Sequence, residues 1–189
     1  MRKLLLGVAA AGVAALLIWQ ALGAPAGQGD PVEKTIVMTS YRAPLRPGEA
    51  PAGHVKNVDI VAVVTILRVE EPRWNSSDGK TPGEFIYTPV LVQAESYLKG
   101  DGPRSFRISQ LGGTRDGVRV VEEDGYAFEA GMKAVVFLNP PGVNINGWTL
   151  ENAYIITGDK AYSQWDQREM PVAELDTQLR QAAAAEAVQ

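Results

Sequence analysis

The chain has 189 residues, with 22 acidic and 18 basic side chains, a net charge of −4, one histidine and no cysteine. The lack of cysteine excludes disulfides, thiol catalysis, cysteine-ligated metals and a lipid carried on cysteine. Acidic and basic residues are interspersed and form no basic patch, so the composition excludes a typical nucleic-acid-binding surface.

The first 29 residues have the pattern of an export segment. Two basic residues precede a largely apolar run that has no charged residue before Asp30. A basic start, an apolar stretch and small residues near its end are typical of a secretory signal, with cleavage predicted after Gly23 or Ala26. The alternative is a membrane anchor helix, because the run is long enough to span a bilayer. Both interpretations predict an extracytoplasmic domain, which is secreted, periplasmic or anchored to the membrane through this segment.

Residues 30–57 are rich in proline and glycine, and Pro44, Pro47 and Pro51 disfavour a regular element there. We therefore expect a linker between the export segment and the folded domain. The single histidine, His54, lies in this stretch. We expect it to be a solvated loop residue, since the sequence has no Gly-x-Ser-x-Gly nucleophile motif that it could serve.

A strand pattern begins at residue 58 and continues to about residue 165. Some segments are apolar and β-branched, as in a buried strand, and others alternate apolar and polar residues, as in a half-buried one. Seven strands are predicted, in the segments VDIVAVVTILRVEE, FIYTPVLVQAESYL, SFRISQL, VRVVEE, MKAVVFLN, GWTLENAYIIT and KAYSQW.

Turn dipeptides punctuate these strands. Asp78-Gly79, Asp116-Gly117 and Asn146-Gly147 tolerate the positive φ of tight hairpin turns. Closely spaced turns with no long helix between strands favour an antiparallel barrel or sandwich over a parallel α/β sheet. We therefore predict one all-β domain over residues 58–165.

The remaining residues, 166–189, are predicted to form a helix and a short tail. Strong helix formers dominate the segment. Val172, Leu175, Leu179 and Ala182 recur at helical spacing, so this stripe is expected to pack against the β-domain.

Several segments between residues 59 and 162 resemble a group of uncharacterised exported bacterial proteins. They are VDIVAVVTILRVEEPRW, DGK, IYTPVLV, YLKGD, QLGGT, FEAGMKAVVFL and the closing strand pair from Tyr154 to Tyr162. The resemblance implies a small closed antiparallel OB-like barrel, similar to netrin-like and tissue-inhibitor-like domains. The N-terminal export or anchor helix and the C-terminal helix, both predicted from the residues themselves, lie on either side of this barrel in the sequence. Its motifs are turn glycines and buried apolar residues, so it implies no catalytic residues.

The densest acidic group consists of Glu122, Glu123 and Asp124, with Glu129 close behind. Carboxylate oxygens are the ligands that Ca²⁺ prefers, which makes these four residues the candidates for a metal site. Their spacing matches no EF-hand, and a short acidic hairpin tip is usually solvated. We therefore predict no metal and no cofactor.

Three aromatic residues are the candidates for ligand binding: Trp74, Tyr87 and Trp148. Each could stack on a sugar or a peptide. The favoured interpretation is packing in the core and at the ends of the barrel, because Trp and Tyr bury large apolar areas. Trp74 is expected to be the exposed exception, since polar turn residues follow it.

No catalytic set of residues emerges from the sequence. We therefore expect a non-catalytic binding module of the cell envelope, with an unknown protein, peptide or glycan as its partner. One alternative is a hydrolase that uses carboxylates, or a metal held between Glu122 and Glu129. A second alternative, a protease-inhibitor-like domain, follows only from the resemblance.

Overall fold

The computed structural model describes residues 34–38, 51–123 and 125–187. The predicted export segment, residues 1–29, lies outside these ranges together with both of its cleavage positions. Within them, no helix is long and apolar enough to cross a membrane. The prediction of an all-β protein with a C-terminal helix is confirmed, because strands dominate and one helix of 15 residues ends the described chain.

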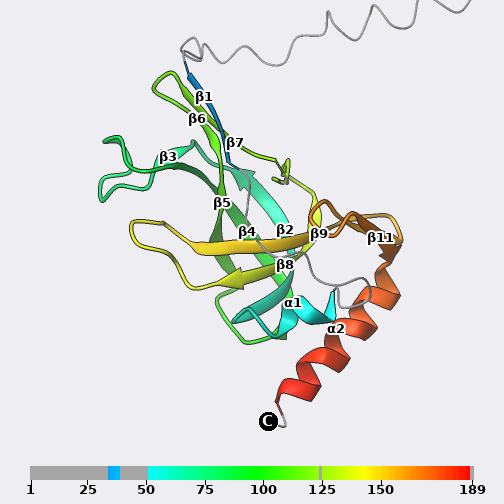
Figure 1. The fold of residues 1–189 in the computed structure, drawn as a ribbon. Coiled ribbons are helices and arrows are strands. Elements are labelled where there is room, and N and C mark those ends of the chain that lie inside the picture. Colours follow the sequence, from blue (N-terminus) through cyan, green and yellow to red (C-terminus); the bar gives the residue numbers. More distant parts are fainter. Residues whose placement is uncertain (1–33, 39–50, 124, 188–189) are drawn as a thin grey trace, which may run out of the picture. The chain divides into compact units, whose positions relative to one another are not determined.

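Figure 1 shows the elements in chain order. Their bounds are β1 Lys34–Met38, α1 Ala52–Val55, β2 Ile60–Val69, β3 Arg73–Trp74, β4 Ile86–Lys99, β5 Ser105–Leu111, β6 Gly113–Arg115, β7 Val118–Glu122, β8 Lys133–Asn139, β9 Trp148–Thr157, β10 Lys160–Ser163, β11 Arg168–Pro171 and α2 Val172–Glu186. The seven predicted strands are confirmed as β2, β4, β5, β7, β8, β9 and β10. The short strands β3, β6 and β11 carry too few residues for an alternating pattern to stand out.

In the main sheet, five strands pair in a closed circuit. β2 pairs with β4, β4 with β5, β5 with β9, β9 with β8, and β8 again with β2. The β5–β9 pair is parallel, and the others in this circuit are antiparallel. β10 and β11 extend the sheet beyond β9.

Alternation along the strands creates two apolar clusters, one on each side of the sheet. The first cluster takes Ala62, Val64 and Ile66 from β2 together with residues of β4, β5, β8 and β9. The second takes the intervening residues, such as Val61 and Phe137, which pack against α1 and α2. These β-branched and aromatic side chains explain why the segments form strands and not helices.

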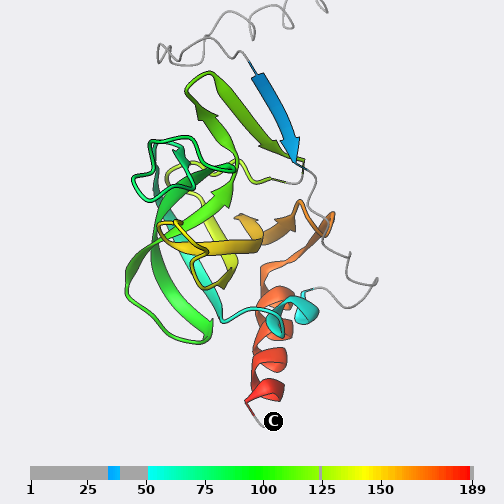
Figure 2. The ribbon, with the colours of Figure 1, turned by 60° about the vertical axis from the view of Figure 1, so that its left-hand side comes forward.

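The helix α2 covers the second cluster with its predicted stripe. Leu175 and Leu179 are fully buried, and Val172 and Ala182 pack beside them. The short helix α1 lies next to α2 (Figure 2). The predicted packing of the C-terminal helix on the β-domain is therefore confirmed.

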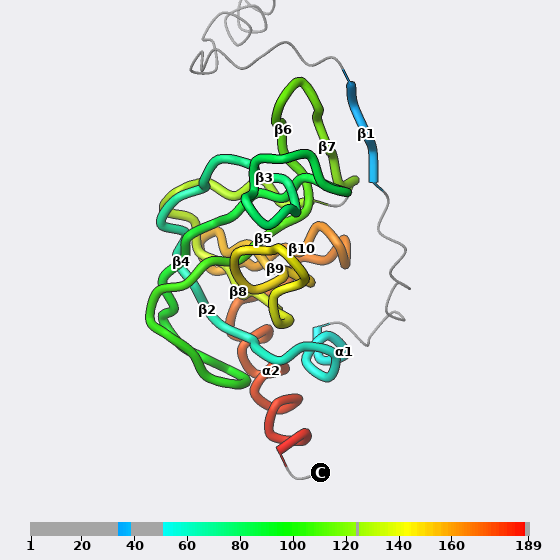
Figure 3. The backbone as a smooth tube through the Cα atoms, turned by 90° about the vertical axis from the view of Figure 1, so that its left-hand side faces the viewer, coloured from blue at the N-terminus to red at the C-terminus, as the bar shows by residue number. Residues whose placement is uncertain are grey.

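A smaller sheet consists of β1, β7 and β6, in that order. β6 and β7 form a hairpin in which Asp116 and Gly117 both have positive φ, as a two-residue turn of this kind requires. β1 lies along β7 in parallel register, from Lys34 opposite Val118 to Met38 opposite Glu122 (Figure 3).

The stretch predicted as a linker, residues 30–57, contributes two regular elements. β1 belongs to the small sheet, and α1 buries Val55 completely in the second apolar cluster. The linker interpretation therefore needs correction at both described parts of this stretch, since proline content does not exclude elements of four or five residues. Residues 39–50 lie outside the described ranges.

Candidate functional site

A cavity of about 270 Å³ lies where β5 and β9 separate. The two strands pair only through Ile108 with Trp148 and Ser109 with Thr149, whereas β5 continues to pair with β4 as far as Leu111. The lining residues come from several separate segments and are Met38, Phe85, Tyr87, Ser109, Gln110, Leu111, Glu122, Tyr126, Ile145, Thr149, Leu150, Glu151 and Trp165.

A β-bulge in β9 places one of these residues in the cavity wall. Leu138 of β8 lies opposite Leu150, but the neighbouring Phe137 lies opposite Asn152, so Glu151 is an extra residue on β9. A bulge of this kind reorients side chains and is frequent beside functional sites. Here Glu151 lines the cavity, while Asn152 is fully buried beside α1.

A close backbone approach fixes the entry to β9. Gly147 has a φ of +122°, and a Cβ atom at this position would lie 2.6 Å from the carbonyl oxygen of Arg107 on β5. Only glycine fits such a contact without a shift of the backbone. The predicted Asn146-Gly147 turn is thus also the point that brings β9 against β5, beside the cavity.

Three of the four hydroxyl groups in the cavity wall donate their protons to other protein atoms. Ser109 Oγ donates to the carbonyl oxygen of Asn146 at 3.1 Å, and Thr149 Oγ1 donates to that of Pro140 at 3.3 Å. The Tyr126 hydroxyl donates to Oδ1 of Asn152. These three oxygens therefore offer lone pairs, and not protons, to a molecule in the cavity.

One acceptor in the wall lacks a partner. Oε1 of Gln110 is buried and has no hydrogen bond to any other described residue. A buried polar atom without a partner costs about 1–3 kcal/mol and is uncommon in folded proteins. Gln110 thus contributes to the cavity lining and also has a buried oxygen that finds no partner among the described residues.

The cavity wall is acidic and aromatic. Glu122 and Glu151 both line it, and each also interacts within the protein. Tyr87 and Tyr126 contribute two of its four aromatic side chains. Apolar side chains complete the wall, so the cavity combines negative charge with a largely non-polar surface.

A buried polar network adjoins the cavity. Its members are His54, Tyr126, Asn152, Tyr154, Ser163 and Asp166, which we call the His54 network. Nε2 of His54 lies 2.9 Å from Oδ1 of Asp166 and 2.7 Å from Nδ2 of Asn152. The Asp166 carboxylate also accepts from the Tyr154 hydroxyl and, at 3.1 Å, from Nδ2 of Asn152.

Burial and hydrogen bonding compete at Asp166. The side chain is only 5% exposed, and this burial favours its neutral form. The hydrogen bonds from His54, Tyr154 and Asn152 outweigh burial and hold the pKa of the carboxyl below its ordinary value. For Tyr154, burial and the negative charge of Asp166 both raise the pKa of the hydroxyl well above its usual range.

The network joins elements that are far apart in the sequence. His54 comes from α1, Asn152 and Tyr154 come from β9, and Asp166 follows β10. Ser163 Oγ donates to Oδ1 of Asn152 at 2.9 Å and accepts from the backbone N–H of Asp166 at 3.2 Å. Through Tyr126, which also lines the cavity, the network fixes one wall of the candidate site.

The geometry of the network indicates a structural role. Ser163 is completely buried and its oxygen contacts Asn152, Tyr126 and the Asp166 amide, not His54. A serine nucleophile would need the histidine as its base and access to a substrate. The expectation that His54 is a solvated loop residue is wrong, because its side chain is 14% exposed and held by Asp166.

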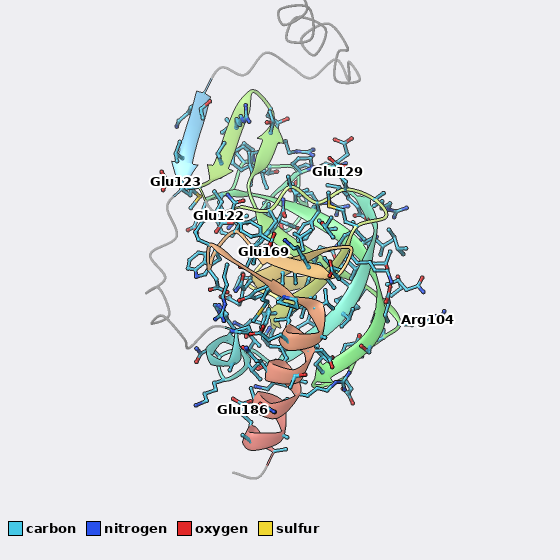
Figure 4. The ribbon with its side chains drawn as sticks, turned by 90° about the vertical axis from the view of Figure 1, so that its right-hand side faces the viewer. Arg104, Glu122, Glu123, Glu129, Glu169 and Glu186 are labelled. Atoms are coloured by element: carbon cyan, nitrogen blue, oxygen red, sulfur yellow. The ribbon has the colours of Figure 1, made fainter. Side chains whose placement is uncertain are left out.

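The four metal candidates do not form a metal site among the described residues, in which no group of three His, Cys, Asp or Glu side chains is placed to hold an ion. Figure 4 shows Glu122 beside Glu123 and Glu129 well apart from both. Asp124 lies outside the described ranges. Glu122 has a different place, at the end of β7 in the cavity wall.

One of the three aromatic candidates lies at the cavity, namely Tyr87, whose hydroxyl accepts the Asn146 N–H at 3.1 Å. Trp148 packs against the first apolar cluster. The prediction of an exposed Trp74 is wrong: it is 6% exposed, and its Nε1 donates to Oδ2 of Asp116 at 2.9 Å.

Sequence reasoning missed Gln110, Tyr126, Glu151 and Trp165, which come from four separate segments. A weak signal exists at Glu151 and Asn152, two polar residues that interrupt the apolar pattern of the β9 segment. The bulge that turns them to different surroundings depends on the register with β8 and has no local signature.

Comparison with known proteins adds no relative, since no family model and no protein of curated function matches the chain.

Proposed function

We propose that this protein is a non-catalytic binding module and that its ligand occupies the cavity between β5 and β9. The observation that carries the proposal is the unpaired Oε1 of Gln110, buried in the wall of a 270 Å³ cavity. Evolution rarely retains an unsatisfied buried acceptor unless it has a role. A ligand that reorients the Gln110 side chain and donates to this oxygen would supply the hydrogen bond that it lacks among the described residues.

The closed circuit of strand pairs supports a small barrel of the OB type. Five strands take part, and the single parallel pair joins β5 to β9. OB barrels are five-stranded and bind their ligands on the surface or at loops beside the strands. In this proposal the barrel is the scaffold, and the site depends on the bulge and turns around β9.

We also propose that the module works outside the cytoplasm, where residues 1–29 act as a secretory signal or an anchor. The basic start and the uncharged run before Asp30 support this location. Mass spectrometry of the N-terminus of the protein from fractionated cells tests it. Recovery of the intact chain in the cytoplasmic fraction would contradict export.

The binding proposal is tested by occlusion of the cavity. Leu111 lines the cavity at the end of β5, so Leu111→Trp fills part of the space. A library of small amines, sugars and dipeptides is screened against the full chain by the shift of its melting temperature, and hits are repeated with the variant. Loss of the hits in Leu111→Trp, but not in a Leu98→Trp control on β4, supports the proposal; hits that persist in Leu111→Trp place binding elsewhere and contradict it.

A second candidate function has one specific observation in its favour. Glu122 and Glu151 line the same cavity, and two carboxylates on opposite sides of a sugar are the requirement for glycoside hydrolysis. Hydrolysis of aryl glycosides that disappears in both Glu122→Gln and Glu151→Gln would establish this activity. Turnover that survives in either variant would exclude the pair as its source.

A further inference from the structure

We infer that β1 is a detachable wall of the cavity and that the cavity binds its ligand only while β1 is docked on β7. This inference rests on the proposed function and concerns the regulation of the same site. Met38, the last residue of β1, lines the cavity, whereas the strand is attached to the domain along one edge.

The attachment of β1 depends on a single neighbour among the described strands. β1 pairs with β7 in parallel register, and β7 pairs with β6 on its other side (Figure 3). The Lys34 N–H donates to the carbonyl oxygen of Gly117, and the Glu123 N–H donates to that of Met38. These contacts join β1 only to β7 and its immediate ends, so β1 can separate without breaking any other described strand pair.

Few side-chain contacts oppose this separation. None of the five residues of β1 is fully buried, and Val37 is 58% exposed. Ile36 and Met38 point to the other face and pack against a third apolar cluster. That cluster consists of Trp74, Ile86 and Val120. Its apolar surface favours the docked strand, but a segment with so few buried contacts opens locally more easily than the whole domain unfolds.

Met38 couples the docking of β1 to the cavity. It lies opposite Glu122 at the end of β7, and both residues line the cavity. A ligand that contacts Met38 binds the docked state more tightly than the undocked state, because undocking removes part of the wall. The coupling is reciprocal, so release of β1 weakens the ligand by the same factor by which the ligand retains β1.

Hydrogen exchange of the full chain measures docking directly. We expect the peptide that covers β1 to exchange at least about a hundredfold faster than peptides from β4, which is paired on both sides. Indole is a small aromatic probe that suits the aromatic lining of the cavity. At about ten times its Kd it should slow exchange in β1 about tenfold, because it stabilises the docked state by this factor.

Two substitutions on opposite faces of β1 form a matched pair. Ile36→Asp places a charge against the third apolar cluster and should release β1, although Ile36 does not line the cavity. If about one molecule in ten remains docked, calorimetry should show indole binding about tenfold more weakly. Val37→Asp places the same charge on the exposed face and should change neither exchange nor affinity.

A disulfide clamp separates loss of docking from misfolding. The chain has no cysteine, so Thr35→Cys with Arg119→Cys introduces a single pair. These two exposed positions lie opposite each other in β1 and β7. Added to Ile36→Asp, the clamp should restore indole affinity when it is oxidised and lose it again on reduction. Binding that stays weak in the oxidised protein would overturn the inference.

The other outcomes separate the inference from the proposed function. If β1 exchanges as slowly as β4, if indole does not slow its exchange, or if Ile36→Asp binds indole as tightly as wild type, the inference is wrong and the binding cavity remains. If Leu111→Trp abolishes neither indole binding nor the binding of any library compound, the proposed function falls, and the inference falls with it.

Discussion

Two polar regions meet at β9, and they differ in how well their hydrogen bonds are satisfied. In the His54 network, every polar atom of the Asp166 carboxylate and of the Asn152 amide has a partner. In the neighbouring cavity, Oε1 of Gln110 has none within the described chain. A polar network whose hydrogen bonds are all made holds its elements together. An acceptor without a partner can still receive a hydrogen bond from another molecule. Adjacent residues of one strand, Glu151 and Asn152, thus lie in different surroundings, one in the cavity wall and one in the His54 network.

The largest effect on the free energy of unfolding is expected when the His54 network is disrupted. Asp166→Ala leaves His54, Asn152 and the Tyr154 hydroxyl without their shared acceptor in a buried place. We expect the free energy of unfolding to fall by about 3 kcal/mol, because each buried donor left without an acceptor costs about 1–3 kcal/mol. Urea denaturation followed by tryptophan fluorescence measures this loss.

Asp176→Ala is the matched control for that experiment. Asp176 pairs with Arg180 one turn away on α2, at 2.9 Å, and both side chains are exposed. We expect no resolvable change from it, because solvent screens such a pair. If the two aspartate variants were equally stable, the network would not have the structural role assigned to it.

The same network predicts how stability depends on pH. The pKa of Asp166 is lower in the folded protein than its ordinary value, since hydrogen bonds from its neighbours favour the ionised form. A lowered pKa adds stability above the pKa of the unfolded state, about 3.9, and this contribution disappears as pH falls through the folded value. We therefore expect wild type to lose stability below about pH 4 more steeply than Asp166→Ala. If the free energy of unfolding fell with pH equally steeply in both proteins, the lowered pKa assigned to Asp166 would be wrong.

The sequence predicts the strands of this fold better than it predicts the site. Val61 to Ile66 and the β8 segment carry their periodicity in neighbouring residues, so their strands can be read locally. His54 and Asp166 are 112 residues apart, and their contact depends on how α1 packs on the sheet. Composition places His54 in a proline-rich stretch, and nothing nearby indicates its partner. Packing, and not local propensity, decides such long-range polar contacts.

A smaller change in the free energy of unfolding, of opposite sign, is expected at Gln110 in the cavity wall. Gln110→Leu removes the unpaired acceptor and keeps the approximate shape of the side chain. We expect the free energy of unfolding to rise by about 1 kcal/mol while affinity for the cavity ligand falls, because the atom that costs stability is the one that binds. Thermal melting and calorimetric titration of the same sample measure both changes.

Gln93→Leu on β4 serves as the control for that prediction. Gln93 has a similar intermediate exposure but does not line the cavity. It should leave ligand affinity unchanged. A Gln110→Leu variant that loses stability as well as binding would indicate that Oε1 of Gln110 has a structural partner, and the contrast between the two regions would then disappear.

The smallest effect on stability is expected for the exposed ion pair between Lys160 and Glu169, although its atoms lie closer together than those of His54 and Asp166. Lys160 Nζ lies 2.6 Å from Oε1 of Glu169 across the β10–β11 hairpin, closer than His54 lies to Asp166. The exposed fractions of the two side chains are 61% and 54%, against 14% and 5% for His54 and Asp166. We expect Glu169→Gln to leave urea denaturation unchanged within error, since water screens the pair in the folded state. If Glu169→Gln lowered the free energy of unfolding as much as Asp166→Ala, distance and not burial would determine how much such contacts contribute to stability. The low exposure of His54 and Asp166 would then no longer explain a structural role of the His54 network.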